Sequence, residues 1–111
     1  MWEKKEIVAL NKSFGGTGRL INEGNLDFAV SAQEQTKDWL LQLAYMVRAL
    51  LVGHAFEDYN KRTAVAAMVT TFEGLKLAYD PYAVDNLATR IAKKNVRNVR
   101  TIRSMIRDVI R

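Results

Sequence analysis

The chain has 111 residues, which suffices for one domain with a modest hydrophobic core and is too short for two. It has no cysteine and one histidine, which excludes disulfide scaffolds, thiolate metal sites and His-rich zinc clusters. Residues 1–60 carry 6 basic and 8 acidic side chains, whereas residues 61–111 carry 11 and 4, so the second half is expected to attract phosphate or acidic groups.

The N-terminal half argues against a signal peptide and against a membrane span. Charged side chains at positions 3–6 precede a short apolar run, and the longest apolar stretch is interrupted by Gln42 and Arg48. We therefore expect a cytoplasmic protein that makes no contact with a membrane.

Glycine is concentrated in residues 13–25, which predicts a flexible loop or a short hairpin. A short helix is expected from Leu26, and Thr36 is the predicted N-cap of a longer helix that ends near His54. Three- and four-residue spacing places one apolar stripe of that longer helix in the core; its members are Trp39 or Leu40, Leu43, Val47, Leu50 and Leu51.

The rest of the chain also shows helical periodicity. A helix is predicted from Asn60 to about Leu77, with its inner face formed by Ala64, Ala67, Met68, Thr71, Phe72 and Leu75. Pro81 interrupts the chain, a short helix follows from about Asp85 to Ala92, and residues 95–111 supply the last helix. Its predicted apolar side is Val99, Ile102, Ile106, Val109 and Ile110, beside a row formed by Arg100, Arg103, Arg107 and Arg111. The sequence thus predicts a small all-α bundle forming a single domain over residues 1–111.

Residues 54–64, HAFEDYNKRTA, form the segment between two predicted helices. A helix N-terminus presents unpaired N–H groups and partial positive charge, so the start of the second helix is a natural seat for phosphate. Lys61 and Arg62 add two cations there, and Asn60 can orient an oxygen. The combination indicates binding of a phosphorylated ligand.

Two further side chains of this segment supply reactive groups. The Asp58 carboxylate could hold a divalent metal between phosphate oxygens. His54 titrates near neutral pH and could remove a proton from an incoming hydroxyl. Together they favour phosphoryl-type transfer, although a lone histidine at a helix end is commonly a capping or packing residue, and a Lys-Arg pair at a helix start is commonly solvated.

The order His-x-Phe-x-Asp-x-Asn-Lys-Arg-Thr-Ala resembles the signature of the Fic/Doc (filamentation and death-on-curing) family. The resemblance implies that His54 is the general base, that Phe56 anchors the loop in the core and that Asp58 binds Mg²⁺. It further implies that Asn60 positions phosphate, that Lys61 and Arg62 hold the phosphates of ATP or another NTP, and that Phe56 and Thr63 belong to the nucleotide site.

The glycine-rich segment resembles the loop that precedes this signature in the family. By that resemblance, Gly16 and Arg19 belong to a flap that receives the backbone of the target by strand addition. The structural alternative is that Arg19 is a solvated loop arginine.

Two positions distinguish the branches of the family. Members that transfer AMP usually have Gly at the position of Lys61 and a second Arg at the position of Val65, so this sequence resembles the short Doc branch. That branch implies transfer of the γ-phosphoryl group to a Ser or Thr hydroxyl of a target protein such as a translation factor. It also implies a toxin that is inhibited by an antitoxin.

Two alternatives accompany this interpretation. The first is transfer of AMP to a protein hydroxyl. The second is a catalytically impaired binding module whose basic second half docks an acidic partner or RNA. It is suggested by Tyr59, which stands where the family commonly has Gly or Ala, because a bulky residue is costly if the position needs a positive φ.

The remaining charged residues bear on partners. Neither Glu23 nor Glu73 fits the inhibitory helix motif of self-silencing family members, so inhibition is expected from another chain. The arginine-rich final helix has three interpretations: a solvated face, a docking surface for an acidic partner, or a patch for nucleic acid. A solvated face is favoured, partner docking is second and nucleic acid is unlikely. Sequence-specific DNA binding in particular is poorly supported, since no aromatic residues are interleaved with the arginines and no glycine turn precedes the helix.

Overall fold

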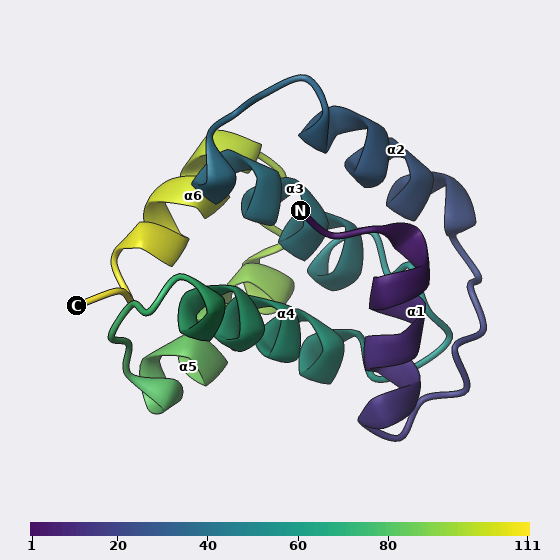
Figure 1. Ribbon diagram of the computed structural model, residues 1–111. Coiled ribbons are helices and arrows are strands. Elements are labelled where there is room, and N and C mark those ends of the chain that lie inside the picture. The colour runs from purple at the N-terminus through teal and green to yellow at the C-terminus, as the bar shows by residue number, and fades with distance from the viewer.

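The computed structural model covers residues 1–111 and contains six α-helices and no strand. The helices are α1 (Lys4–Ser13), α2 (Glu23–Gln33), α3 (Trp39–Leu51), α4 (Asn60–Gly74), α5 (Pro81–Lys94) and α6 (Val99–Arg107), shown in Figure 1. The prediction of an all-α protein is confirmed.

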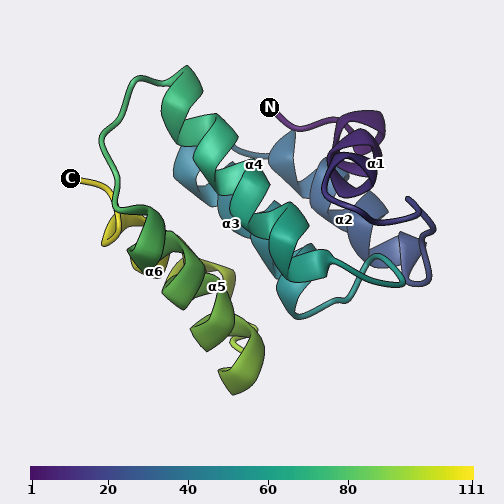
Figure 2. The same ribbon diagram turned by 90° about the horizontal axis from the view of Figure 1, so that it is seen from below.

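Helix α3 is the centre of the molecule. It packs against α2, α4, α5 and α6, while α1 lies across α4 and α2 on the opposite side from α5 and α6 (Figure 2). The predicted stripe on α3 explains this position, because Leu43, Val47 and Leu50 are at most 2% exposed. A single cluster of 24 buried residues, drawn from all six helices and the segments between them, forms the core.

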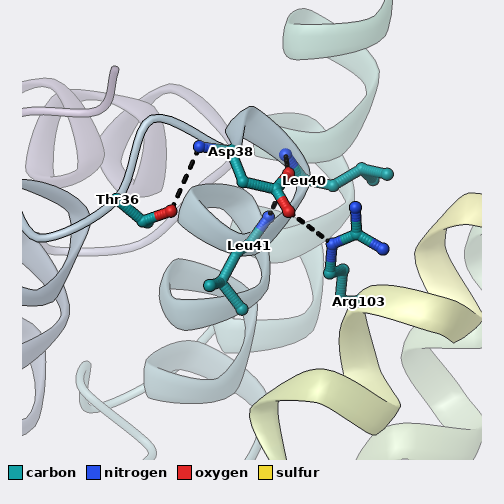
Figure 3. A network of polar contacts seen from close by, with 5 residues as sticks. All are labelled: Thr36, Asp38, Leu40, Leu41 and Arg103. Carbon is teal, nitrogen blue, oxygen red and sulfur yellow. Dashed lines mark hydrogen bonds and ion pairs between the residues drawn. The ribbon is translucent and has the colours of Figure 1, made fainter.

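Helix α3 begins at a different residue from the predicted one. Its N-cap is Asp38, whose carboxylate accepts hydrogen bonds from the backbone N–H groups of Leu40 and Leu41. The predicted cap, Thr36, instead accepts a bond from the N–H of Asp38 (Figure 3). Asp38 also pairs with Arg103 of α6 at 2.7 Å, so one carboxylate both starts α3 and holds α6 against it.

Two helices differ more strongly from the sequence predictions. Residues 4–13 form α1, for which no helix was expected, and Glu3 and Glu6 form a capping box at its start. Helix α5 begins at Pro81 rather than near Asp85, because proline is well suited to the first position of a helix and Asp80 caps it. Proline therefore starts this helix instead of interrupting the chain.

Other boundaries also shift. Helix α2 starts three residues before Leu26, α4 ends at Gly74 rather than Leu77, and α6 occupies only the middle of residues 95–111. Leu75, predicted to face the core, lies beyond the end of α4 and is 48% exposed. The inner face of α4 is otherwise as predicted, with Ala64, Ala67, Met68 and Phe72 fully buried.

The glycine-rich segment is an irregular loop between α1 and α2, and it contains no hairpin. Its one β-type pairing is an antiparallel bridge from Leu20 to Phe56, a residue of the segment between α3 and α4. A second isolated bridge joins Tyr79 to Ile110 near the C-terminus. None of the six helices has the length and apolar character required to cross a lipid bilayer.

Candidate functional site

The segment between α3 and α4 is held in a fixed shape by Asn60. The Asn60 side chain accepts a hydrogen bond from the backbone N–H of Phe56 at 3.0 Å and donates one to the carbonyl of Phe56 at 2.9 Å. Both ends of its amide are therefore occupied by the loop. The structure thus gives Asn60 the role of a loop clamp, whereas the sequence interpretation made it a phosphate-orienting group.

Phe56 lies at the base of this loop. Its ring is 1% exposed and belongs to the core cluster, as does the neighbouring Ala55. The expectation that Phe56 anchors the loop agrees with this burial. The same burial leaves the ring no surface that a nucleotide could contact.

The glycine-rich loop is hydrogen-bonded to the segment between α3 and α4, here called the signature loop (residues 52–59). The N–H groups of Ile21 and Asn22 donate to the carbonyl of Ala55, and the N–H of Glu57 donates to the carbonyl of Arg19 at 3.0 Å. The Arg19 guanidinium lies 3.8 Å from the Glu57 carboxylate, with both side chains largely exposed. The predicted flap therefore lies along the predicted catalytic loop (Figure 2).

Asn11 of α1 connects these loops, and the sequence interpretation did not identify it. Its buried amide donates to the carbonyl of Asp58 at 3.0 Å and to the Thr63 hydroxyl at 3.1 Å, and accepts from the N–H of Gly18 at 2.9 Å. Gly16 packs against it so closely that a Cβ there would lie 2.1 Å from the Asn11 oxygen. Gly16 therefore permits the packing of the loop on α1.

The signal for Asn11 was present in the sequence. It lies four residues after Ile7, on the same face of α1, and both residues are fully buried. A fully buried amide must find hydrogen-bond partners, so a polar residue on an inner helical face indicates a connecting role.

The N-terminus of α4 differs from those of α3, α5 and α6, which are capped by the side chains of Asp38, Asp80 and Asn98. The N-cap of α4 is Tyr59, whose side chain makes no capping bond. The backbone N–H groups of Asn60, Lys61 and Arg62 accordingly have no acceptor within the fold. The first turn of α4 thus presents free donors.

Tyr59 adopts the left-handed backbone conformation, with φ 57° and ψ 27°. The position therefore has the positive φ that was considered because the family commonly has Gly or Ala there. An L-residue with a large side chain adopts this conformation at a cost of about 1 kcal/mol. The guanidinium carbon of Arg62 lies over the Tyr59 ring, 4.7 Å from the centre of the ring. This stacking offsets part of the backbone cost.

Both cations at the start of α4 already have partners. Lys61 lies 3.4 Å from the Asp85 carboxylate of α5, and Arg62 donates to the carbonyl of Phe14 at 3.3 Å. A depression of about 500 Å³ lies at this point of the surface. Its lining residues are Phe14, Lys61, Arg62, Val65, Ala66, Val69 and Asp85. An anion that binds at the first turn of α4 must compete with Asp85 for Lys61.

Thr63 is fully buried one residue further along α4. Its hydroxyl donates to the carbonyl of Tyr59 at 2.8 Å and accepts from Asn11. These bonds occupy the hydroxyl, so the structure assigns Thr63 to the fold rather than to a nucleotide contact.

His54 lies near the beginning of the segment between α3 and α4, away from the cations at the start of α4. It is exposed, has a positive φ of 46°, and its carbonyl accepts a bond from the Asn22 side chain at 2.9 Å. Its neighbours in a depression of about 450 Å³ include Asn25, Arg48 and Arg97. Neither Lys61 nor Arg62 lines this depression, so the predicted base and the predicted cations face different hollows of the surface.

Asp58 has an exposed carboxylate that forms no ion pair, while its carbonyl is bound by Asn11. No group of three or more His, Asp or Glu side chains is arranged to hold a metal ion. Mg²⁺ commonly uses one or two carboxylates and completes its shell with water and substrate phosphates. A single free carboxylate beside the predicted phosphate seat fits this mode of binding.

A scan against models of known protein families finds no match for this chain, and a search of curated proteins finds none either.

Proposed function

We propose that the protein is a Doc-like transferase that moves the γ-phosphoryl group of ATP to a Ser or Thr hydroxyl of a target protein. The observation that carries the proposal is the uncapped start of α4. There, three free backbone N–H groups coincide with the side chains of Lys61 and Arg62. Free amides, a helix dipole and two cations at one point are the requirements for holding a triphosphate.

His54 acts as the general base in this proposal. It takes the proton of the target hydroxyl while the hydroxyl oxygen forms a bond to the γ-phosphorus. The bond between that phosphorus and the bridging oxygen breaks, and ADP leaves. His54 faces one hollow and the α4 cations face the other, so the target and the nucleotide approach the loop from different sides.

Asp58 would hold Mg²⁺ in this proposal. Bound there, the metal would neutralise charge on the phosphate oxygens. The chain itself positions the carboxylate, because Asn11 fixes the backbone of Asp58 through its carbonyl. Asn60 keeps the loop shape on which the placement of Asp58 and His54 depends.

The flap gives the target a place to bind. Leu20 is bridged to Phe56, and the bonds of this bridge come from the flanking residues Arg19 and Ile21. In an antiparallel bridge of this kind, the N–H and C=O of Leu20 itself point to the opposite edge. An extended segment of the target could add to that edge, next to the loop that carries His54.

Radiolabelled ATP tests the proposal. The protein, a cell lysate and Mg²⁺ are incubated with γ-labelled ATP in one sample and α-labelled ATP in another. Label on a protein from γ-labelled ATP alone is expected. Label from α-labelled ATP would instead establish AMP transfer, and no label in either sample would contradict the transferase proposal.

As a Doc-like toxin, the protein would require an inhibitor from another chain, since the sequence shows no internal inhibitory motif.

A binding module without catalysis is the second candidate, and one observation favours it. The side chains of Asn60, Lys61 and Arg62 all contact other groups of the fold, and the Tyr59 ring stacks on the Arg62 guanidinium. Calorimetry with Mg-ATP separates the two candidates. Measurable binding to the wild-type chain supports the transferase, whereas binding that appears only in Tyr59→Gly shows that tyrosine blocks the site.

A further inference from the structure

The surface formed by the end of α5, the turn after it and α6 carries many cations and no acid. Residues 90–107 contain seven Lys or Arg side chains and neither Asp nor Glu. Of the seven, Arg103 is paired with Asp38. The other six are exposed and form no ion pair: Arg90, Lys93, Lys94, Arg97, Arg100 and Arg107, here called the basic surface.

Helical geometry directs these cations outward from two packed helices. Arg90 and Lys93 are three residues apart, on the side of α5 away from the buried Leu87 and Ile91. Lys94 lies in the last turn of α5 and is also exposed. On α6, Arg100 and Arg107 lie seven residues apart, away from the buried Ile102 and Ile106, so they share the outer face. Helices α5 and α6 pack together (Figure 2), so the two sets of cations stand on neighbouring helices.

An acid limits the basic surface at one edge. Asp108, just after α6, shares a depression of about 630 Å³ with Arg90, Lys93 and Lys94. It does not pair with any of them within 4 Å. The cations are therefore left with charge that the protein does not neutralise.

The composition of this surface discriminates among partners. Protein interfaces depend on buried aromatic or aliphatic anchors, but none of the large exposed hydrophobic side chains lies in residues 90–107. Single-stranded nucleic acid is commonly held by stacking of bases on aromatic rings, and the chain has no aromatic residue after Tyr82. The phosphate backbone of a duplex requires neither feature, only correctly spaced cations.

We propose that the basic surface binds the phosphate backbone of duplex nucleic acid. Phosphate contacts carry no sequence information, so the binding is independent of sequence. The oxygen of the Asn98 side chain, a polar group at the start of α6, is used to cap that helix. Of the six cations, Arg97 alone lines a depression of the proposed transferase site, the one that also contains His54. The other five line neither depression, so the two proposals can fail independently.

Fluorescence anisotropy with labelled DNA and RNA duplexes of the same sequence tests this proposal. The logarithm of the binding constant should fall linearly with the logarithm of salt concentration, by about 0.9 per phosphate neutralised on B-DNA. The double variant Arg97→Gln/Arg100→Gln should bind more weakly, with a salt slope smaller by about 2. The matched control Lys5→Gln/Lys12→Gln removes the same charge from α1 and should leave the slope unchanged.

Each outcome decides a part of the proposal. Binding of both duplexes supports recognition of the shared backbone, and binding of one alone supports the proposal for that duplex. No binding at low salt, or an equal loss in the α1 control, overturns it. Binding of polyglutamate with no binding of either duplex also overturns it, in favour of an acidic protein partner. A second variant, Arg90→Gln/Lys93→Gln, should also bind the duplex more weakly than the wild type. Circular dichroism of all variants shows whether each one is folded.

Discussion

At the scale of single residues, Asn11 connects segments that are far apart in the sequence. Its one amide joins α1, the glycine-rich loop, the signature loop and α4 through bonds to Gly18, Asp58 and Thr63. The position of Asp58 therefore depends on a residue 47 positions earlier in the chain.

Replacing Asn11 by alanine should destabilise the protein by about 2–4 kcal/mol, because three buried or half-buried polar groups lose a partner at once. Urea denaturation followed by circular dichroism measures the change. The matched control is Asn86→Ala, which removes an exposed amide of α5 that makes no hydrogen bond with another side chain and should change stability by less than about 0.5 kcal/mol. Equal losses in the two variants would show that Asn11 does not connect the loops.

Tyr59 is the residue that most directly limits access to the start of α4. Glycine adopts a φ of 57° without strain, and its introduction removes the ring that lies under Arg62. Tyr59→Gly should therefore bind Mg-ATP more tightly than the wild-type chain in calorimetry, by roughly three- to tenfold if about 1 kcal/mol of stacking is removed. Tyr59→Phe keeps both the ring and the strain and should match the wild type. Weaker binding in the glycine variant would mean that the ring assists the nucleotide.

At the scale of elements, the junction of α3 and α6 depends on Asp38. Burial would by itself raise the pKa of the Asp38 carboxyl, but the hydrogen bond from Arg103 and those from the N–H groups of Leu41 and Leu40 hold the pKa below its usual value (Figure 3). Because the pKa is lower in the folded state, the stabilisation is complete above the unfolded value of about 3.9 and is lost as the pH falls through the folded value.

Asp38→Ala should therefore lower the free energy of unfolding by about 1–2 kcal/mol at neutral pH, through loss of the cap and of the bond to Arg103. The difference between variant and wild type should shrink once the pH falls below about 4. Thermal melts over a pH series measure it. Glu34→Ala, which removes an exposed carboxylate without an ion pair, should give a small difference at every pH. A constant difference for Asp38→Ala would exclude the electrostatic part of this account.

The elements also show what sequence periodicity can predict. The apolar stripe of α3 and most of the inner face of α4 follow from three- and four-residue spacing, because burial of one helical face dominates their stability. Helix α1 was missed because its inner face includes the polar Asn11, and its burial depends on partners 47 to 52 residues away. The start of α5 was misplaced because Pro81 was interpreted as a break, although Asp80 and Pro81 together form a good helix start.

The candidate site was predictable in part. The sequence identifies the segment that carries His54, Asp58 and the α4 cations, because their spacing is local. It could not show that the amide of Asn60 is used by the loop, or that Lys61 faces Asp85, since both depend on how the chain closes on itself. The contact between the glycine-rich loop and residues 55–57 likewise appears only in three dimensions.

At the scale of the whole molecule, two chemical surfaces lie on different helices. The segment between α3 and α4, the start of α4 and the glycine-rich loop lie together at one end of the helices (Figure 2), whereas the basic surface belongs to α5, α6 and the turn between them. The variant Arg90→Gln/Lys93→Gln removes charge from residues that line neither depression of the proposed transferase site, so it should leave transfer to a small peptide substrate unchanged. Substitutions at His54 should likewise leave binding to a duplex unchanged.

The central claim is that His54 activates a hydroxyl for attack on a phosphoryl group bound at the start of α4. The most direct test compares protein labelling from γ-labelled ATP by the wild type, His54→Ala and the control Gln35→Ala, an exposed change in the turn after α2. The account predicts labelling by the wild type and the control, and a loss of at least about a hundredfold in His54→Ala with unchanged circular dichroism. Labelling by His54→Ala at the wild-type rate would contradict it.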